Sequence, residues 1–122
     1  MKKLVVCSVV AVALLGIMGL AQTVSADPAG GPITGISRVA ARAVNVHMIT
    51  YRGGEQADFA IVGDGDTTLN VVVRDQNGNT VLRTTGRGDS FNVSWQVART
   101  GIYTIFVVNE GGVYNEYRWR AY

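Results

Sequence analysis

From Val44 to the C-terminus, apolar and polar residues alternate with a period of two, which is typical of half-buried β-strands. The clearest alternation runs from Phe91 to Val97, where every second residue is apolar and the residues between are polar. The pattern predicts strands over residues 44–51, 57–62, 67–74, 80–85, 91–97, 102–109 and 117–121. Turns rich in glycine and asparagine separate them at spacings of about 8–12 residues. No stretch after residue 26 has a sustained helical period, so we expect an all-β, antiparallel sandwich or barrel of about seven strands.

The first 26 residues have the three parts of an export signal. Lys2 and Lys3 form a basic start, and an apolar run follows over residues 4–20. Val24-Ser25-Ala26 then supplies the small residues that a signal peptidase reads, so we expect cleavage after Ala26 and a secreted or periplasmic protein. The alternative is a retained membrane anchor, because the run reaches the lower limit of ~17 residues for a membrane span. No basic flank follows the run, which favours cleavage.

The residues after the signal divide into a lead-in and a domain. Residues 27–43 begin with prolines and glycines, and we expect them to form a flexible lead-in. Within this segment, residues 36–43 fit one helical turn or the start of a strand equally well. Residues 44–122 are expected to form the β-sandwich domain.

Net charge and cysteine content narrow the range of partners. The whole chain of 122 residues has a net charge of +2, from 11 Lys+Arg and 9 Asp+Glu. Both lysines lie in the predicted signal, which leaves 9 arginines against 9 acidic residues and a net charge of zero. A neutral domain lacks the positive field that nucleic acids or anionic membranes attract, so neither is expected as a partner after cleavage. Cys7, the only cysteine, also lies in the signal, so no disulfide is expected.

Four short motifs in the domain resemble those of a known family. They are Tyr51-Arg52-Gly53-Gly54-Glu55, the acidic segment from Gly63 to Val71, the turn Asp75-Gln76-Asn77-Gly78, and the closing segment from Thr100 to Asn109. Their order and spacing resemble the bacterial pre-peptidase C-terminal domain, a jelly-roll-like β-sandwich that usually follows a secreted enzyme. The resemblance implies a non-catalytic module with a binding, structural or accessory role. Here the domain would follow directly on the signal, so we expect it to act alone or with a partner in trans.

Asp64 and Asp66 form the one candidate for a metal site. Calcium prefers six to eight oxygen ligands, and alternating carboxylates in one loop can supply them. The family-like motif would carry acidic residues at the next two alternating positions as well, but Thr68 and Asn70 stand there. We therefore expect at most a weak calcium site and no other cofactor, and the alternative is that the loop is only a polar turn.

No residue pattern predicts catalysis. His47 is the only histidine, and neither Ser90 nor Ser94 lies in the sequence pattern of a nucleophile elbow. We expect His47 to be a packing or surface residue rather than a base. The sequence therefore predicts a protein that is not an enzyme, with no catalytic residues.

The expected binding surface consists of apolar and aromatic residues. Tyr117 and Trp119 alternate with arginines and are expected to point into the core. In contrast, Val72, Phe106 and Val108 fall on the outward positions of their strands, while Tyr114 and Tyr122 lie in a loop and at the C-terminus. An apolar outer face usually marks a partner site, unless the lead-in of residues 27–43 covers it. We expect a protein or polysaccharide partner; the alternative function is a carbohydrate- or matrix-binding protein with a weak calcium-assisted loop.

Overall fold

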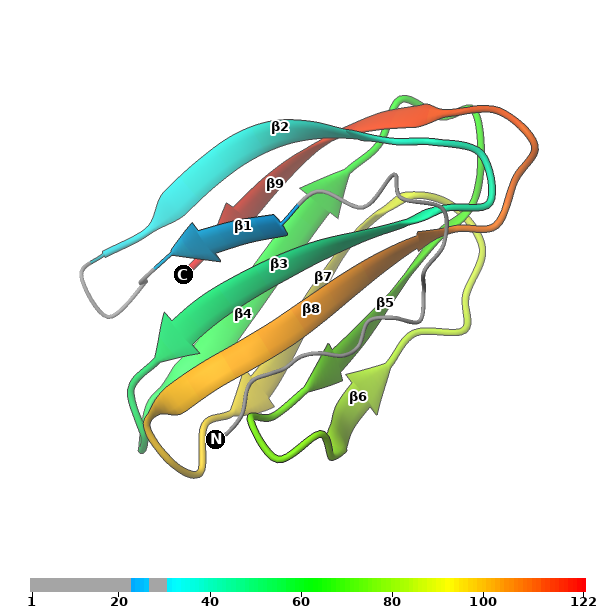
Figure 1. Cartoon of the computed structure of the whole chain (residues 1–122). Helices are drawn as coiled ribbons and strands as arrows, with labels where there is room; N and C mark the ends of the chain where they lie inside the picture. Colours follow the sequence, from blue (N-terminus) through cyan, green and yellow to red (C-terminus); the bar gives the residue numbers. More distant parts are fainter. Residues whose placement is uncertain (1–22, 27–30) are drawn as a thin grey trace.

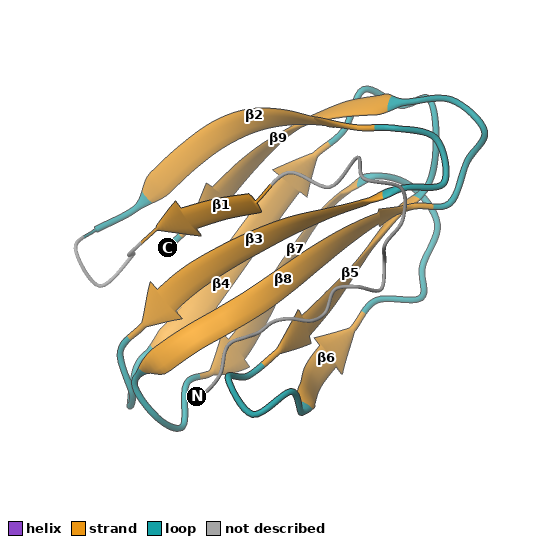
Figure 2. Cartoon of the chain, viewed as in Figure 1, coloured by secondary structure: helices purple, strands orange, loops and turns teal. Residues whose placement is uncertain are grey.

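The computed structural model describes residues 23–26 and 31–122 and shows two β-sheets packed face to face (Figures 1 and 2). The strands are β1 (Thr23–Ala26), β2 (Ile33–Val39), β3 (Val44–Tyr51), β4 (Gln56–Val62), β5 (Leu69–Arg74), β6 (Thr80–Arg83), β7 (Ser90–Gln96), β8 (Gly101–Asn109) and β9 (Asn115–Ala121). One sheet has the order β1-β3-β8-β5-β6, and the other has the order β2-β9-β4-β7. Neighbouring strands are antiparallel except β1 and β3, which are parallel. The predicted all-β sandwich is confirmed.

The seven strands predicted from the alternating pattern correspond to β3 through β9, with ends that differ by up to two residues. The turn between β5 and β6 forms as its sequence suggests. The carboxylate of Asp75 accepts the backbone N–H groups of Asn77 and Asn79, each at 2.9 Å. Gly78 adopts a φ of 85°, a conformation that side chains with a Cβ atom rarely take. Local turn chemistry therefore defines this hairpin, as expected for an Asn-Gly turn.

The prediction of a flexible lead-in over residues 27–43 is wrong for most of that segment. Ile33–Val39 forms β2, which pairs with β9 along its whole length. The glycines and prolines suggested a loop, but Gly35 is needed for packing rather than for a turn. A Cβ atom at position 35 would lie 2.7 Å from the ring of Trp119 on β9, so any larger residue would force this ring to shift. Residues 27–30 lie outside the described residues.

The predicted export signal lies mostly outside the described residues, which exclude residues 1–22. Its last four residues form β1, whose backbone pairs with Val46–Ile49 of β3. β1 therefore lies at the edge of the five-stranded sheet (Figure 1). Cleavage after Ala26 stays a prediction.

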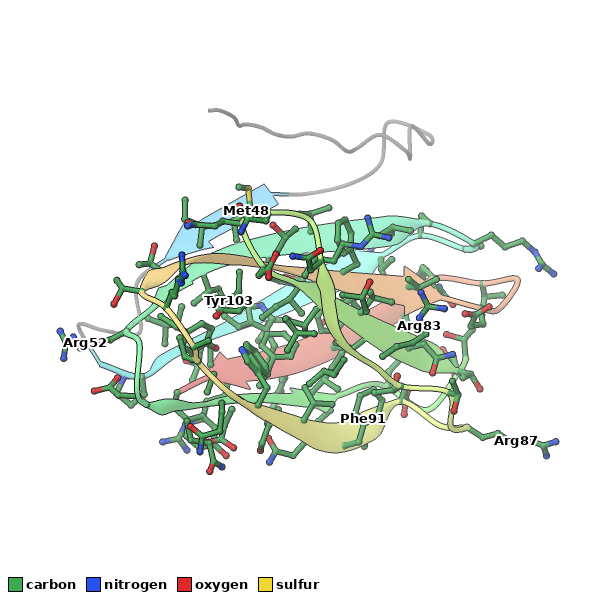
Figure 3. The ribbon with its side chains drawn as sticks, turned by 90° about the horizontal axis from the view of Figure 1, so that it is seen from below. Met48, Arg52, Arg83, Arg87, Phe91 and Tyr103 are labelled. Atoms are coloured by element: carbon green, nitrogen blue, oxygen red, sulfur yellow. The ribbon has the colours of Figure 1, made fainter. Side chains whose placement is uncertain are left out.

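The core lies between the two sheets and contains two aromatic groups. Tyr51, Trp95 and Tyr103 pack with ring centroids 5.3–5.9 Å apart, and Figure 3 shows Tyr103 between the sheets. Phe59 and Trp119 stack at 6.0 Å in the second group. The predicted inward orientation of Tyr117 and Trp119 is confirmed, because both side chains are buried. The described residues form no helix, and thus none that is long and apolar enough to cross a membrane.

Candidate functional site

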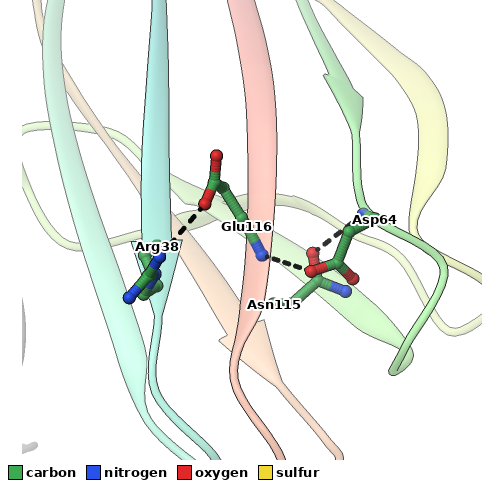
Figure 4. Close-up of polar contacts among 4 residues, drawn as sticks. All are labelled: Arg38, Asp64, Asn115 and Glu116. Atoms are coloured by element: carbon green, nitrogen blue, oxygen red, sulfur yellow. Dashed lines mark hydrogen bonds and ion pairs between the residues drawn. The ribbon is translucent and has the colours of Figure 1, made fainter.

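The structure uses Asp64 of the acidic loop to attach the loop to β9. One of its carboxylate oxygens accepts the backbone N–H of Asp66 at 3.0 Å. The other accepts the backbone N–H of Glu116 at 2.9 Å, as Figure 4 shows. The backbone N–H of Asp64 donates to the side-chain oxygen of Asn115 at 3.3 Å. Each carboxylate oxygen thus accepts one backbone N–H, and no group of three metal-ligating side chains occurs among residues 23–26 and 31–122. Asp64 therefore has a structural role in the loop.

A buried carboxylate that the sequence did not indicate lies beside this loop. Asp89 precedes β7, is only 7% exposed, and accepts the N–H of Gly65 at 2.7 Å and the side-chain amide of Asn115 at 2.8 Å. Asn115 also donates to the hydroxyl of Thr67 at 3.1 Å. Residues 65, 89 and 115 are far apart in the sequence, so no local pattern could have revealed the cluster. The network joins the loop before β5 to the start of β7 and of β9, and satisfied buried networks of this kind favour one specific packing arrangement.

Three of the predicted surface residues lie together on the outer face of the five-stranded sheet. Val72 on β5 pairs with Phe106 on β8, and Phe106 pairs with Val46 on β3. Val108 lies on the same face, two residues further along β8. All four side chains are half-buried. The strand pairing brings these residues together, and their role in binding stays a prediction.

Residues 31–43, the described part of the lead-in, do not fold over this face, which was one of the two arrangements that the sequence left open. β2 belongs to the other sheet, and Val39 at its end is completely buried in the core. Val44 is the first residue of β3 and lies beside Val108, so it extends the apolar face instead of covering it.

The other two predicted residues, Tyr114 and Tyr122, are separate from this face and flank the four-stranded sheet. The guanidinium of Arg38 lies 4.4 Å from the ring centre of Tyr114, and that of Arg120 lies 4.6 Å from the ring centre of Tyr122. The predicted five-residue surface is therefore two surfaces on opposite sides of the sandwich. The alternating pattern showed which residues point outward but could not show to which sheet each strand belongs.

The outer face of the four-stranded sheet carries an open depression of about 500 Å³. Arg118 of β9 lies at its centre, with Ile36 of β2 as its register partner on one side and Val62 of β4 on the other. Ile36 is 63% exposed and Val62 is 55% exposed, both high values for aliphatic residues. We call Ile36, Val62, Tyr114 and Arg118 the arginine face. Only Tyr114 of this set was predicted from the sequence, because an exposed isoleucine on a strand looks the same as a buried one in sequence.

The acidic side chains around the arginine face have hydrogen-bond or ion-pair partners, whereas its central arginine has none among the described residues. Glu116 forms an ion pair with Arg38 at 3.3 Å, and the carboxylate of Asp64 is bound by backbone N–H groups (Figure 4). Arg118, in contrast, forms no hydrogen bond or ion pair with any residue that the structure describes. The face therefore presents an exposed, unpaired guanidinium between two aliphatic side chains, an arrangement that suits a carboxylate with apolar groups beside it.

His47 is completely enclosed between the sheets and is not positioned for catalysis. It is 1% exposed, and its ring centre lies 4.7 Å from that of Trp119 and 5.7 Å from that of Phe59. Its Nε2 lies 2.7 Å from the hydroxyl of Tyr117, which also accepts a hydrogen bond from the amide of Asn45 at 3.0 Å. The two groups share one hydrogen bond, whose direction follows the tautomer of the imidazole. Burial lowers the pKa of His47 to about 4 and raises the pKa of the Tyr117 hydroxyl.

No family model matches the sequence, and no curated protein sequence matches it. Solved structures, however, share its fold. The pre-peptidase C-terminal domain of a collagenase from Bacillus anthracis superposes with a TM-score of 0.61 at 12% identity, over 84% of this chain and 94% of that one. The chain has the fold of a pre-peptidase C-terminal domain.

The same fold occurs in periplasmic inhibitors of g-type lysozyme. The inhibitor from Aeromonas hydrophila superposes with a TM-score of 0.56 at 11% identity, over 83% of this chain and 96% of that one. The corresponding Salmonella Typhimurium inhibitor superposes with a TM-score of 0.52 at 9% identity, over 82% and 96% of the two chains. Identities this low establish the shared fold alone. Solved structures with a similar fold thus include a domain of a collagenase and two periplasmic lysozyme inhibitors.

Proposed function

We propose that this protein is an exported, non-catalytic module that binds a protein partner through the arginine face. The observation that carries the proposal is the unpaired guanidinium of Arg118 between the exposed side chains of Ile36 and Val62. Arginine and tyrosine are enriched among the residues that contribute most to protein interfaces. Periplasmic inhibitors with this fold support both a binding function and a location outside the cytoplasm.

The partner that suits this face presents an acidic side chain beside apolar ones. Arg118 and Arg120 have no acidic partner among the described residues, while Glu116 is already paired with Arg38. A carboxylate entering the depression would meet Arg118, and its apolar neighbours would cover Ile36 and Val62. Burial of these exposed aliphatic groups would contribute about 25 cal/mol of favourable binding free energy per Å² of apolar surface removed from water.

The alternative function, carbohydrate or matrix binding with a calcium-assisted loop, has less support from the geometry. Sugar-binding sites use free aromatic faces, but arginine guanidiniums lie over the rings of both Tyr114 and Tyr122. The carboxylate of Asp64 is bound to backbone N–H groups, which leaves Asp66 as the freer acid of that loop.

Site-specific photo-crosslinking in the source cells tests the proposal. A photoreactive amino acid at Ile36 should yield one protein adduct, and Arg118→Glu should abolish it because the charge at the centre of the face is reversed. Arg83→Glu is the matched control, since Arg83 lies on β6 of the other sheet and its reversal should leave the adduct unchanged. An adduct that persists in Arg118→Glu, or is lost equally in both variants, would contradict the proposal. Adduct formation only with polysaccharide would favour the alternative.

A further inference from the structure

The edge of β3 that β1 covers is the second interaction surface that the structure indicates. β3 has the sequence VNVHMITY, which contains no charged residue and no proline. Proteins usually protect an edge strand with charges, proline, a bulge or short length, because its free N–H and C=O groups can pair with another strand. The opposite edge of the same sheet is protected in this way: β6 has four residues, ends in Arg83, and pairs with β5 through a register shift.

The structure shows that the β3 edge accepts a strand. β1 pairs with Val46–Ile49 in parallel register. On the other side of β3, Asn109 donates its backbone N–H to the carbonyl of Ala43 at 3.0 Å. Hydrogen-bonding direction alternates along an antiparallel strand, so Val46 and Met48 direct their N–H and C=O groups away from β8 and towards β1. Figure 3 shows Met48 beside β1.

β1 consists of Thr23–Ala26, the last four residues of the predicted export signal. Cleavage after Ala26 would remove this strand and leave the edge of β3 unpaired. We propose that export uncovers the β3 edge, and that two exported copies then pair through it, β3 against β3, into a two-fold symmetric dimer. This inference rests on the export that the proposed function includes, but it uses a different sheet from the arginine face.

A second copy is the occupant that the residues of β3 favour. The outward side chains Val44, Val46, Met48 and Thr50 are uncharged, so two β3 strands can lie side by side without repulsion. The exported part has 9 arginines and 9 acidic residues, and a net charge near zero also favours self-association. A two-fold axis at the edge would place Val46 and Met48 of one copy against the same residues of the other. It would also join the two apolar faces that run from Val46 through Phe106 to Val72.

The test uses the protein as the cell exports it. The full chain is expressed, the exported form is purified, and intact mass shows whether its first residue is Asp27. Light scattering after size exclusion should then give twice the mass of one exported chain. Met48→Lys places a charge at the edge and should give the mass of a single chain. Thr104→Lys is the matched control, because Thr104 is the register partner of Met48 on the same face but on the central strand β8, and this variant should remain a dimer.

Amide hydrogen exchange provides a readout that does not depend on a variant folding. Exchange across β3 should be slow at high protein concentration and should become faster on dilution, because dimer dissociation frees the N–H groups of Val46 and Met48. A monomeric exported wild type, a dimer that persists in folded Met48→Lys, dissociation by Thr104→Lys, or exchange independent of concentration would each overturn the proposal. An exported protein that keeps residues 23–26 would also overturn it, because β1 then covers the edge. A photo-adduct at Ile36 that depends on Arg118 would still support the proposed function in all these cases.

Discussion

Acidification should destabilise the folded protein through His47, the only histidine in the chain. In the folded state the imidazole is buried against Phe59 and Trp119, and its Nε2 lies 2.7 Å from the hydroxyl of Tyr117. Protonation would place a charge in this apolar site. The unfolded chain has no such restriction, so it binds a proton at a higher pH than the folded chain does.

The magnitude follows from the two pKa values. Burial lowers the pKa of His47 to about 4 in the folded protein, from the ordinary value of 6.5 that applies to the unfolded chain. The contribution of the neutral imidazole to the free energy of unfolding is therefore fully present above pH 6.5 and is lost as the pH falls from 6.5 towards 4. Within that window the free energy of unfolding should fall by about 1.4 kcal/mol per pH unit, which is about 2 kcal/mol between pH 7.5 and pH 5.

Urea unfolding followed by tryptophan fluorescence measures this loss at several pH values between 7.5 and 5. Histidine is the side chain that ordinarily changes its charge in this range, and His47 is the only one in the chain, so we expect it to dominate the slope. His47→Gln is the control: it retains an oxygen that can accept from Tyr117 but cannot be protonated in this range, so its stability should be nearly independent of pH. A wild-type stability that stays constant from pH 7.5 to 5, or an unchanged slope in His47→Gln, would refute the reasoning.

Three further predictions concern packing, the buried carboxylate and calcium. Gly35→Ala should lower the free energy of unfolding by about 1–3 kcal/mol, because the new Cβ would lie 2.7 Å from the ring of Trp119; chemical denaturation measures it. Asp89→Ala should cost about 2–3 kcal/mol, because it leaves the buried amide of Asn115 and the N–H of Gly65 without their acceptor. Calcium at 1 mM should raise the melting temperature by less than about 5 °C, since the oxygens of Asp64 already accept backbone N–H groups.

Each of these predictions has a control variant or an outcome that would contradict it. Gly112→Ala should change stability by less than about 0.5 kcal/mol, because no atom lies within 4 Å of a Cβ there. Asp66→Ala removes an exposed carboxylate of the same loop and should be similarly mild. Equal losses in Asp66→Ala and Asp89→Ala would show that the buried network is not the source of the effect. A larger rise in melting temperature with calcium would reveal a tight site in the acidic loop.

The sequence alone determined the strands from Val44 onward and the inward or outward direction of their side chains. Both are local properties, because side chains of a strand alternate between its two faces and turns form from neighbouring residues. For this reason the alternating pattern was sufficient to place Tyr117 and Trp119 in the core, and Phe106 and Val108 on an outer face.

The tertiary structure decided which strands share a sheet, and this depends on contacts between distant residues. β2 was missed because the prolines and glycines at the start of residues 27–43 suggested a loop. The strand depends on Gly35, which has no Cβ and so leaves space for the ring of Trp119, 84 positions further along the chain. The network of Asp64, Asp89 and Asn115 also forms only when three separate segments meet. The arginine face exists because β2, β9 and β4 are neighbours, which places Ile36 and Val62 on either side of Arg118. A local alternating pattern carries no information about such pairings, because strand order follows from how the whole chain buries its apolar surface.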